Sequence, residues 1–134
     1  MTAHKQAHIL VVEDDRDIRD SVVEILEDEG YAVSDAGGGQ EALDRLASGP
    51  ARPDLILLDL MMPGMNGFQF REEQLKSEEY GQIPVVIITA DSTAQERVGP
   101  LQAAAFLRKP IKIQPLLNTI KQTLERTEGR SSHS

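Results

Sequence analysis

The chain has 134 residues, a net charge of −8, 40% hydrophobic and 27% charged residues, and no cysteine. This size and composition are typical of one globular domain with its own core, and the lack of cysteine excludes disulfides, thiolate catalysis and cysteine-based metal sites. No apolar run approaches the roughly 18 residues that span a membrane, and an acidic chain without a block of Lys and Arg is poorly suited to bind nucleic acid directly. We therefore expect a cytoplasmic domain with no membrane or nucleic-acid contact of its own.

Short apolar runs alternate with stretches whose apolar residues recur at helical spacing. In chain order they predict a strand at 8–12, a helix at 18–29, a strand at 31–34, a helix at 40–47, a strand at 54–58, a helix at 68–77, a strand at 84–88, a helix at 93–102 interrupted by Gly99 and Pro100, a strand at 104–108 and a helix at 113–124. This alternation predicts an α/β fold, a doubly wound parallel sheet of five strands with helices on both faces. We divide the chain into an N-terminal extension (1–7), one domain (8–126) and a polar tail (127–134).

Charged and polar residues stand where the predicted strands end. Glu13 and Asp14 follow the first strand, Asp59 the third, Thr89 the fourth and Lys109 the fifth. In an open parallel sheet, ligands bind beyond the carboxyl ends of the strands, so these side chains are the candidate site.

The residue types at these positions favour a cation and a phosphoryl group. Carboxylates without histidine suit Mg²⁺, which takes oxygen ligands and keeps several waters. Three neighbouring carboxylates stay ionised only with positive charge nearby, which Mg²⁺ and Lys109 together would supply. A hydroxyl at Thr89, beside a metal and an ammonium, fits the binding of phosphoryl oxygens.

These segments, in this order, resemble the receiver domain of two-component response regulators. The resemblance runs from about residue 9 to residue 124 and rests on ILVVEDD at 9–15, DLMMPGMNG at 59–67, TA at 89–90 and KP at 109–110. Each segment alone is a weak signal, but four of them in this order, each at the end of a strand, are specific. The resemblance implies a flavodoxin-like (βα)5 fold with strand order 2-1-3-4-5.

The resemblance also implies roles for the acidic residues. Asp59 would accept a phosphoryl group from a sensor histidine kinase or a phosphotransfer protein. Asp14 and Asp59 would be side-chain ligands of Mg²⁺, the Met61 carbonyl a backbone ligand, and Glu13 would hold a metal-bound water.

The resemblance implies further roles in binding the phosphoryl group, in the conformational response to it and in its hydrolysis. Thr89 and Lys109 would bind the phosphoryl group, and Lys109–Pro110 is where such domains carry a cis peptide. Phe106 occupies the position of a switch aromatic that moves with Thr89, although a phenylalanine in the core of the fifth strand fits the sequence equally well. Met61 and Asp91 would flank the path of the water that removes the phosphoryl group.

The expected function is therefore a phosphorylation-controlled binding module for a downstream protein target or output domain, not an enzyme with a separate substrate. A phosphatase with an aspartyl nucleophile would need a second Asp two residues later, where Met61 stands. A flavin carrier would need a glycine- and hydroxyl-rich loop after the first strand, where three acids stand at 13–15. A receiver-like interaction module that is never phosphorylated stays open, as does the choice between a stand-alone receiver and a piece of a longer regulator.

Overall fold

The computed structural model describes residues 6–48, 52–60, 64, 67–90 and 103–132. Its elements are β1 (His8–Val12), α1 (Arg16–Asp28), β2 (Ala32–Ala36), α2 (Gly39–Ser48), β3 (Leu55–Asp59), α3 (Gly67–Leu75), β4 (Val85–Thr89), β5 (Ala105–Arg108) and α5 (Ile113–Ser132). Within these residues, no helix is both long and apolar enough to cross a membrane.

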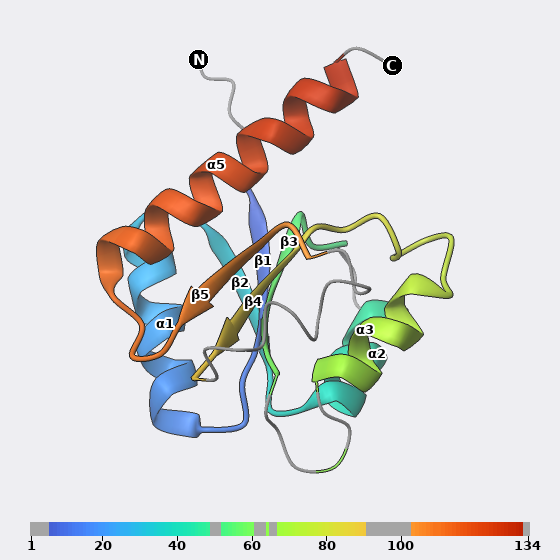
Figure 1. Ribbon diagram of the computed structural model, residues 1–134, viewed down its shortest axis with the longest axis horizontal. Coiled ribbons are helices and arrows are strands. Elements are labelled where there is room, and N and C mark those ends of the chain that lie inside the picture. Colours follow the sequence, from blue (N-terminus) through green and yellow to red (C-terminus); the bar gives the residue numbers. More distant parts are fainter. Residues whose placement is uncertain (1–5, 49–51, 61–63, 65–66, 91–102, 133–134) are drawn as a thin grey trace.

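The five strands form one parallel sheet in the order β2-β1-β3-β4-β5. Helices α1 and α5 lie on one face of this sheet, and α2 and α3 lie on the other (Figure 1). The start of β1 and the end of α5 lie at the same end of the molecule, opposite the carboxyl ends of the strands. The fold class and the strand order predicted from the sequence are confirmed.

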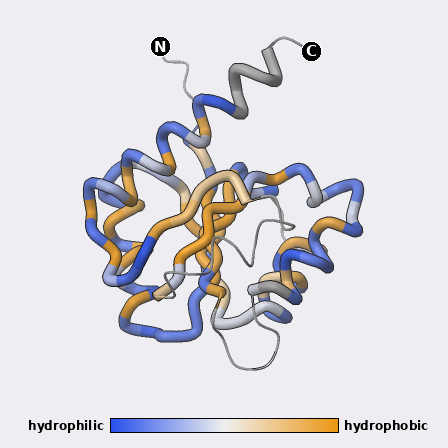
Figure 2. Tube along the Cα trace, in the orientation of Figure 1, coloured by the Kyte–Doolittle hydropathy of each residue, from blue (hydrophilic) through white to orange (hydrophobic). Residues whose placement is uncertain are grey.

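The core has two halves, one on each face of the sheet. Alternate residues of β1 show the division: Leu10 and Val12 pack toward α2 and α3, whereas Ile9 and Val11 pack toward α1 and α5. In Figure 2, hydrophobic residues (orange) accordingly concentrate in the central strands, and hydrophilic residues (blue) lie mainly on the surrounding helices. Because helices cover both faces, β3 and β4 are buried along their whole length, which explains their unbroken apolar sequences.

The observed boundaries of the elements differ from the predicted ones by a few residues at several places, of which three matter here. Asp59 and Thr89 are the last residues of β3 and β4 rather than the residues that follow them. Residues 127–132, predicted as part of a polar tail, continue α5 as a helix. No proline stops the helix after Leu124, and each further residue adds one backbone hydrogen bond. The division into extension, domain and tail remains a prediction, and the helix at 93–102 with its Gly99–Pro100 interruption lies outside the described residues.

Helix α1 begins immediately after the acidic run because Asp15 caps it. The Asp15 carboxylate accepts hydrogen bonds from the backbone N–H groups of Asp17, at 3.0 Å, and Ile18, at 3.2 Å. Such a cap satisfies donors that have no partner within the helix. It also fixes the short connection in which Glu13 and Asp14 stand.

Candidate functional site

Three carboxylates meet at the carboxyl ends of β1 and β3. Glu13 and Asp14 follow β1, Asp59 ends β3, and these two strands are paired neighbours. One carboxylate oxygen from each residue lies within 4.8 Å of the others. Glu13 and Asp59 are buried, with 4% and 2% exposure, whereas Asp14 is exposed. The cluster is therefore anchored in the protein on one side and open to solvent on the other.

Lys109 is bonded to both buried acids. Its Nζ donates to Asp59 Oδ2 at 3.1 Å and lies 3.2 Å from Glu13 Oε1. The Lys109 backbone N–H donates to the Thr89 carbonyl at 2.9 Å, which fixes the lysine beside the end of β4. The next peptide bond, Lys109–Pro110, is cis, as the resemblance implied. The ammonium offsets carboxylates that would be costly to bury alone.

Glu13 uses both of its carboxylate oxygens within the protein. Oε1 faces Lys109, and Oε2 accepts the backbone N–H of Asp15 at 3.1 Å. The pKa of Glu13 is raised from 4.5 to about 7, chiefly by burial and also by the hydrogen bond and negative charge of Asp59, although the hydrogen bonds with Asp15 and Lys109 act to lower it. Burial alone would lower the pKa of Lys109, but Asp59 and Glu13 outweigh it and raise that pKa.

The charge balance of the cluster suits a divalent cation. Lys109 pairs with two of the three carboxylates, Glu13 and Asp59, so its single positive charge leaves the cluster with a surplus of negative charge. All three offer hard oxygen ligands, the kind that Mg²⁺ prefers. A bound cation would relieve the repulsion that contributes to the raised pKa of Glu13. The residues present therefore fit a metal ion.

Thr89 stands at the same edge of the sheet as the acids. The register pairs Asp59 with Ile88, so Thr89 is one residue beyond the strand partner of Asp59. Thr89 is 3% exposed and pairs with Arg108 of β5. The sheet thus brings together the five residues predicted from the strand ends.

Of the residues predicted to act in switching and dephosphorylation, the structure describes Phe106 but not Met61 or Asp91. Phe106 pairs with Ile87, is partly buried and packs against the core half that lies toward α2 and α3. This placement fits a core residue and leaves its role as a switch a prediction. Met61 and Asp91 lie outside the described residues.

No role was predicted from the sequence for Arg19 and Asp35, which hold the main chain of the loop after β1 at Glu13. Arg19 Nη1 donates to the Glu13 carbonyl at 2.9 Å, and its Nε lies 3.3 Å from Asp35 Oδ2. These residues are distant in sequence and belong to α1 and β2, so no local spacing rule connects them. A charged residue beside the apolar stripe of α1 was the one available signal.

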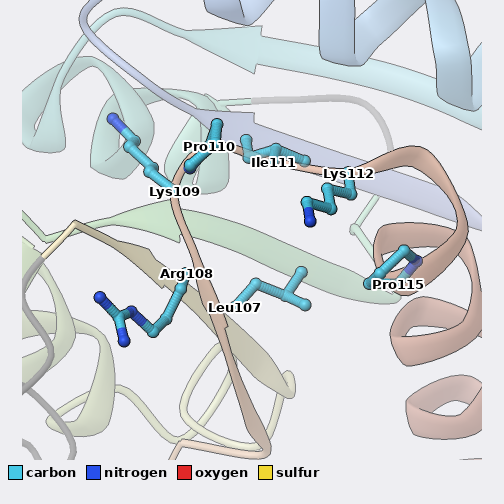
Figure 3. A pocket seen from close by; sticks show the side chains of 7 residues that line it. All are labelled: Leu107, Arg108, Lys109, Pro110, Ile111, Lys112 and Pro115. Carbon is cyan, nitrogen blue, oxygen red and sulfur yellow. The ribbon is translucent and has the colours of Figure 1, made fainter.

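Two open hollows adjoin Lys109. One, of about 340 Å³, lies between β5 and the start of α5 and is drawn in Figure 3; its lining is Leu107, Arg108, Lys109, Pro110, Ile111, Lys112 and Pro115. Arg108 and Lys109 point in different directions there, although they are neighbours in the chain. The other, of about 640 Å³, runs along α1 and is lined mainly by apolar side chains. Lys109 therefore belongs both to the acidic cluster and to the walls of these hollows.

Comparison with known proteins places the chain in a family. The family model of the response regulator receiver domain matches residues 9–121. Response regulator MprA of Mycolicibacterium vanbaalenii is 41% identical to this chain over 121 residues, which cover 89% of this chain and 51% of the relative. MprA of Mycobacterium avium is also 41% identical, over 122 residues that cover 90% of this chain and 52% of the relative. The chain thus spans about half the length of these curated relatives.

Solved structures agree. Chemotaxis protein CheY4 of Vibrio cholerae superposes with a TM-score of 0.82 at 31% identity, over 89% of this chain and 99% of CheY4. A CheY-like receiver domain protein of Methanospirillum hungatei superposes with a TM-score of 0.84 at 29% identity, over 94% of this chain and 99% of that protein. On the sequence match, the strand order and these superpositions, the chain belongs to the response regulator receiver domain family.

Proposed function

We propose that this domain accepts a phosphoryl group on Asp59 from the phosphohistidine of a sensor histidine kinase or a phosphotransfer protein, with the help of Mg²⁺. The observation that carries the proposal is the buried Asp59 carboxylate, bonded to Lys109 and grouped with Glu13 and Asp14. Membership of the receiver family supports it. We place this exchange in the cytoplasm.

The chain's own residues would perform the transfer by positioning and charge. An Asp59 oxygen forms a bond to phosphorus while the bond from phosphorus to the donor imidazole breaks. The imidazole leaves with that electron pair and takes up a proton. Lys109 and the Thr89 hydroxyl then donate hydrogen bonds to the phosphoryl oxygens, which carry the negative charge. The product is the phosphorylated domain itself, from which we expect the group to be lost slowly by hydrolysis.

The acids would divide the work of holding the cation. Asp14 and Asp59 would be ligands, with the Met61 carbonyl as a third, and Glu13 would act through a water. The bonds that Glu13 already makes to Lys109 and Asp15 favour this indirect role. When bound, Mg²⁺ neutralises charge on the carboxylates and on phosphoryl oxygens.

Phosphorylation would change a surface that a downstream protein or output domain recognises. The added group brings negative charge and acceptor oxygens to the end of β3. We propose that Thr89 moves toward it and that Phe106 follows into the space left behind. Chemical shifts of Phe106 that stay fixed on addition of beryllofluoride, while those near Asp59 change, would overturn this switch.

Incubation with acetyl phosphate and Mg²⁺, followed by measurement of the intact mass, tests the proposal. We expect a gain of one phosphoryl group in the parent and in Asp28→Asn, an exposed aspartate of α1, and none in Asp59→Asn. A gain that persists in Asp59→Asn would overturn the assignment. No gain in the parent would favour the alternative, an interaction module that works without phosphorylation.

A further inference from the structure

Arg19 joins three segments of the chain behind the acidic cluster. It lies in α1, and its side chain is 19% exposed. Nη1 donates to the main-chain carbonyl of Glu13 at 2.9 Å, and Nε lies 3.3 Å from Oδ2 of Asp35 in β2. The planar guanidinium can serve two acceptors at once because its donors point in fixed directions. One side chain therefore connects α1, β2 and the loop after β1.

The acceptor in the loop is the peptide between Glu13 and Asp14. The paired register of β1 and β2 ends at Val12 and Ala36. Beyond it, the Glu13 N–H donates to the Ala36 carbonyl at 3.1 Å, and the Glu13 carbonyl accepts from Arg19. Both polar groups of the Glu13 main chain are thus held. The orientation of this peptide sets the directions in which the Glu13 and Asp14 side chains leave the loop.

The guanidinium itself has little freedom. The backbone after β2 passes so close that a Cβ at Gly37 would lie 3.2 Å from Arg19 Nη1 and 3.4 Å from Glu41 Oε1. The Gly37 N–H donates to that Glu41 oxygen at 2.9 Å, which fixes the backbone there. Glycine leaves the guanidinium just enough room, and the surrounding atoms hold it in place.

We propose that Arg19 is a positioning residue for the cation site. This inference rests on the proposed function, in which Glu13, Asp14 and Asp59 hold Mg²⁺. The three carboxylates repel one another, so a loop without support would move them apart when no cation is present. By fixing the Glu13–Asp14 peptide against β2, Arg19 keeps the carboxylates converged and ready for the cation.

The chain contains a matched control for this role. Arg16 is on the same helix and pairs with Asp20 at 3.8 Å, but its side chain is 83% exposed and that of Asp20 is 63% exposed. Arg16→Gln removes the same charge as Arg19→Gln without touching the loop carbonyl. Charge alone predicts that either substitution tightens Mg²⁺ binding, because it removes a positive charge near a cation. Positioning predicts the opposite sign for Arg19→Gln.

The test is the dissociation constant of Mg²⁺, measured by isothermal titration calorimetry at a temperature where urea titrations show each variant to be folded. We expect Arg19→Gln to weaken binding about tenfold, in the range seen when residues that orient metal ligands are lost. We expect no weakening in Arg16→Gln, and an intermediate value in Arg19→Lys, whose single ammonium can reach Asp35 or the Glu13 carbonyl but not both. A loss of stability without a change in this constant would show a merely structural role and overturn the proposal.

Asp35→Asn provides a second variant should Arg19→Gln fail to fold. It releases Arg19 from β2, and Asp20→Asn is its control for the loss of one negative charge. We expect Asp35→Asn to weaken Mg²⁺ binding more than Asp20→Asn does. Equal constants for each variant and its control, in a parent that binds Mg²⁺, would overturn the role of Arg19 alone. A parent that does not bind Mg²⁺ would overturn the metal site of the proposed function and this role with it.

Discussion

Lys109 reaches across β4 to meet Asp59. Strands β3 and β5 do not pair with each other, since β4 lies between them. Even so, Nζ of Lys109, the residue after β5, lies 3.1 Å from Oδ2 of Asp59, the last residue of β3. The charge balance of the site therefore depends on the order of three strands.

Removal of the ammonium should destabilise the cation-free protein. Lys109→Met leaves Glu13 and Asp59 buried without their counter-charge, and we expect the free energy of unfolding to fall by about 1–3 kcal/mol. Lys76→Met is the control, because Lys76 forms an exposed ion pair with Glu73, whose loss should cost less than about 1 kcal/mol. Urea titrations in EDTA and in Mg²⁺ give the comparison. Equal losses in the two variants would contradict the prediction, and Mg²⁺ should restore part of the loss in Lys109→Met.

Stability without metal should decline as the pH rises toward neutrality. The pKa of Glu13 is raised from 4.5 to about 7 in the folded protein, mainly by burial. Between these pH values the folded state binds more protons than the unfolded state, so the free energy of unfolding falls with increasing pH. The contribution is complete below about 4.5 and lost above about 7. Urea titrations in EDTA from pH 4 to pH 8 should show a flatter profile for Glu13→Gln; parallel profiles would contradict this cause.

Asp14 should contribute to metal binding while opposing stability. Asp14→Asn removes a ligand and one of three repelling charges, so we expect weaker Mg²⁺ binding together with slightly higher stability in metal-free buffer. Asp17→Asn, an exposed acid in the first turn of α1, is the matched control. Calorimetry with Mg²⁺ and urea titration in EDTA measure the two effects. Parent-like Mg²⁺ affinity in Asp14→Asn would rule out its role as a ligand.

Gln74 should stabilise the fold without affecting the site. This residue of α3 is fully buried, and its Nε2 donates to the carbonyls of Tyr80, at 2.8 Å, and Ile83, at 3.2 Å, ahead of β4. Gln74→Ala should cost about 2–4 kcal/mol, through lost hydrogen bonds and a cavity. Gln40→Ala, at an exposed position of α2, is the control. A urea titration measures the loss; a change in Mg²⁺ affinity would show unexpected coupling to the site.

Met61 should set how long the phosphoryl group lasts. Its apolar side chain would cover the approach of water to phosphorylated Asp59, an expectation that rests on the family resemblance because Met61 lies outside the described residues. Met61→Asn should therefore lose the phosphoryl group faster while still binding Mg²⁺ through the backbone carbonyl. First-order decay of the phosphorylated protein in Mg²⁺ buffer measures the effect. Equal or slower decay would mean that this side chain does not shield the group.

The parts of the fold that the sequence predicted are those with a strong local pattern. Buried strands such as β3 and β4 are unbroken apolar runs, and their ends are marked by Asp59 and Thr89. A parallel sheet then brings these ends together, whatever lies between them in the chain.

The supporting contacts had no such pattern. Arg19 meets Asp35 only because α1 packs beside β2. Gln74 stands at a helix position where the sequence gives no sign that its amide will turn toward two carbonyls. Both contacts follow from how the chain packs in three dimensions, which local residue spacing does not reveal.

The shared position of the start of β1 and the end of α5 has a practical consequence. Both lie at the end of the sheet away from the acids, as Figure 1 shows. A fluorescent label or an affinity tag joined before His8 or after Ser132 would be attached at the end of the molecule that is farthest from Asp59. Such a fusion leaves the approach to the carboxylates open, so surface capture of the domain and its encounter with a phosphodonor can be followed on the same molecule.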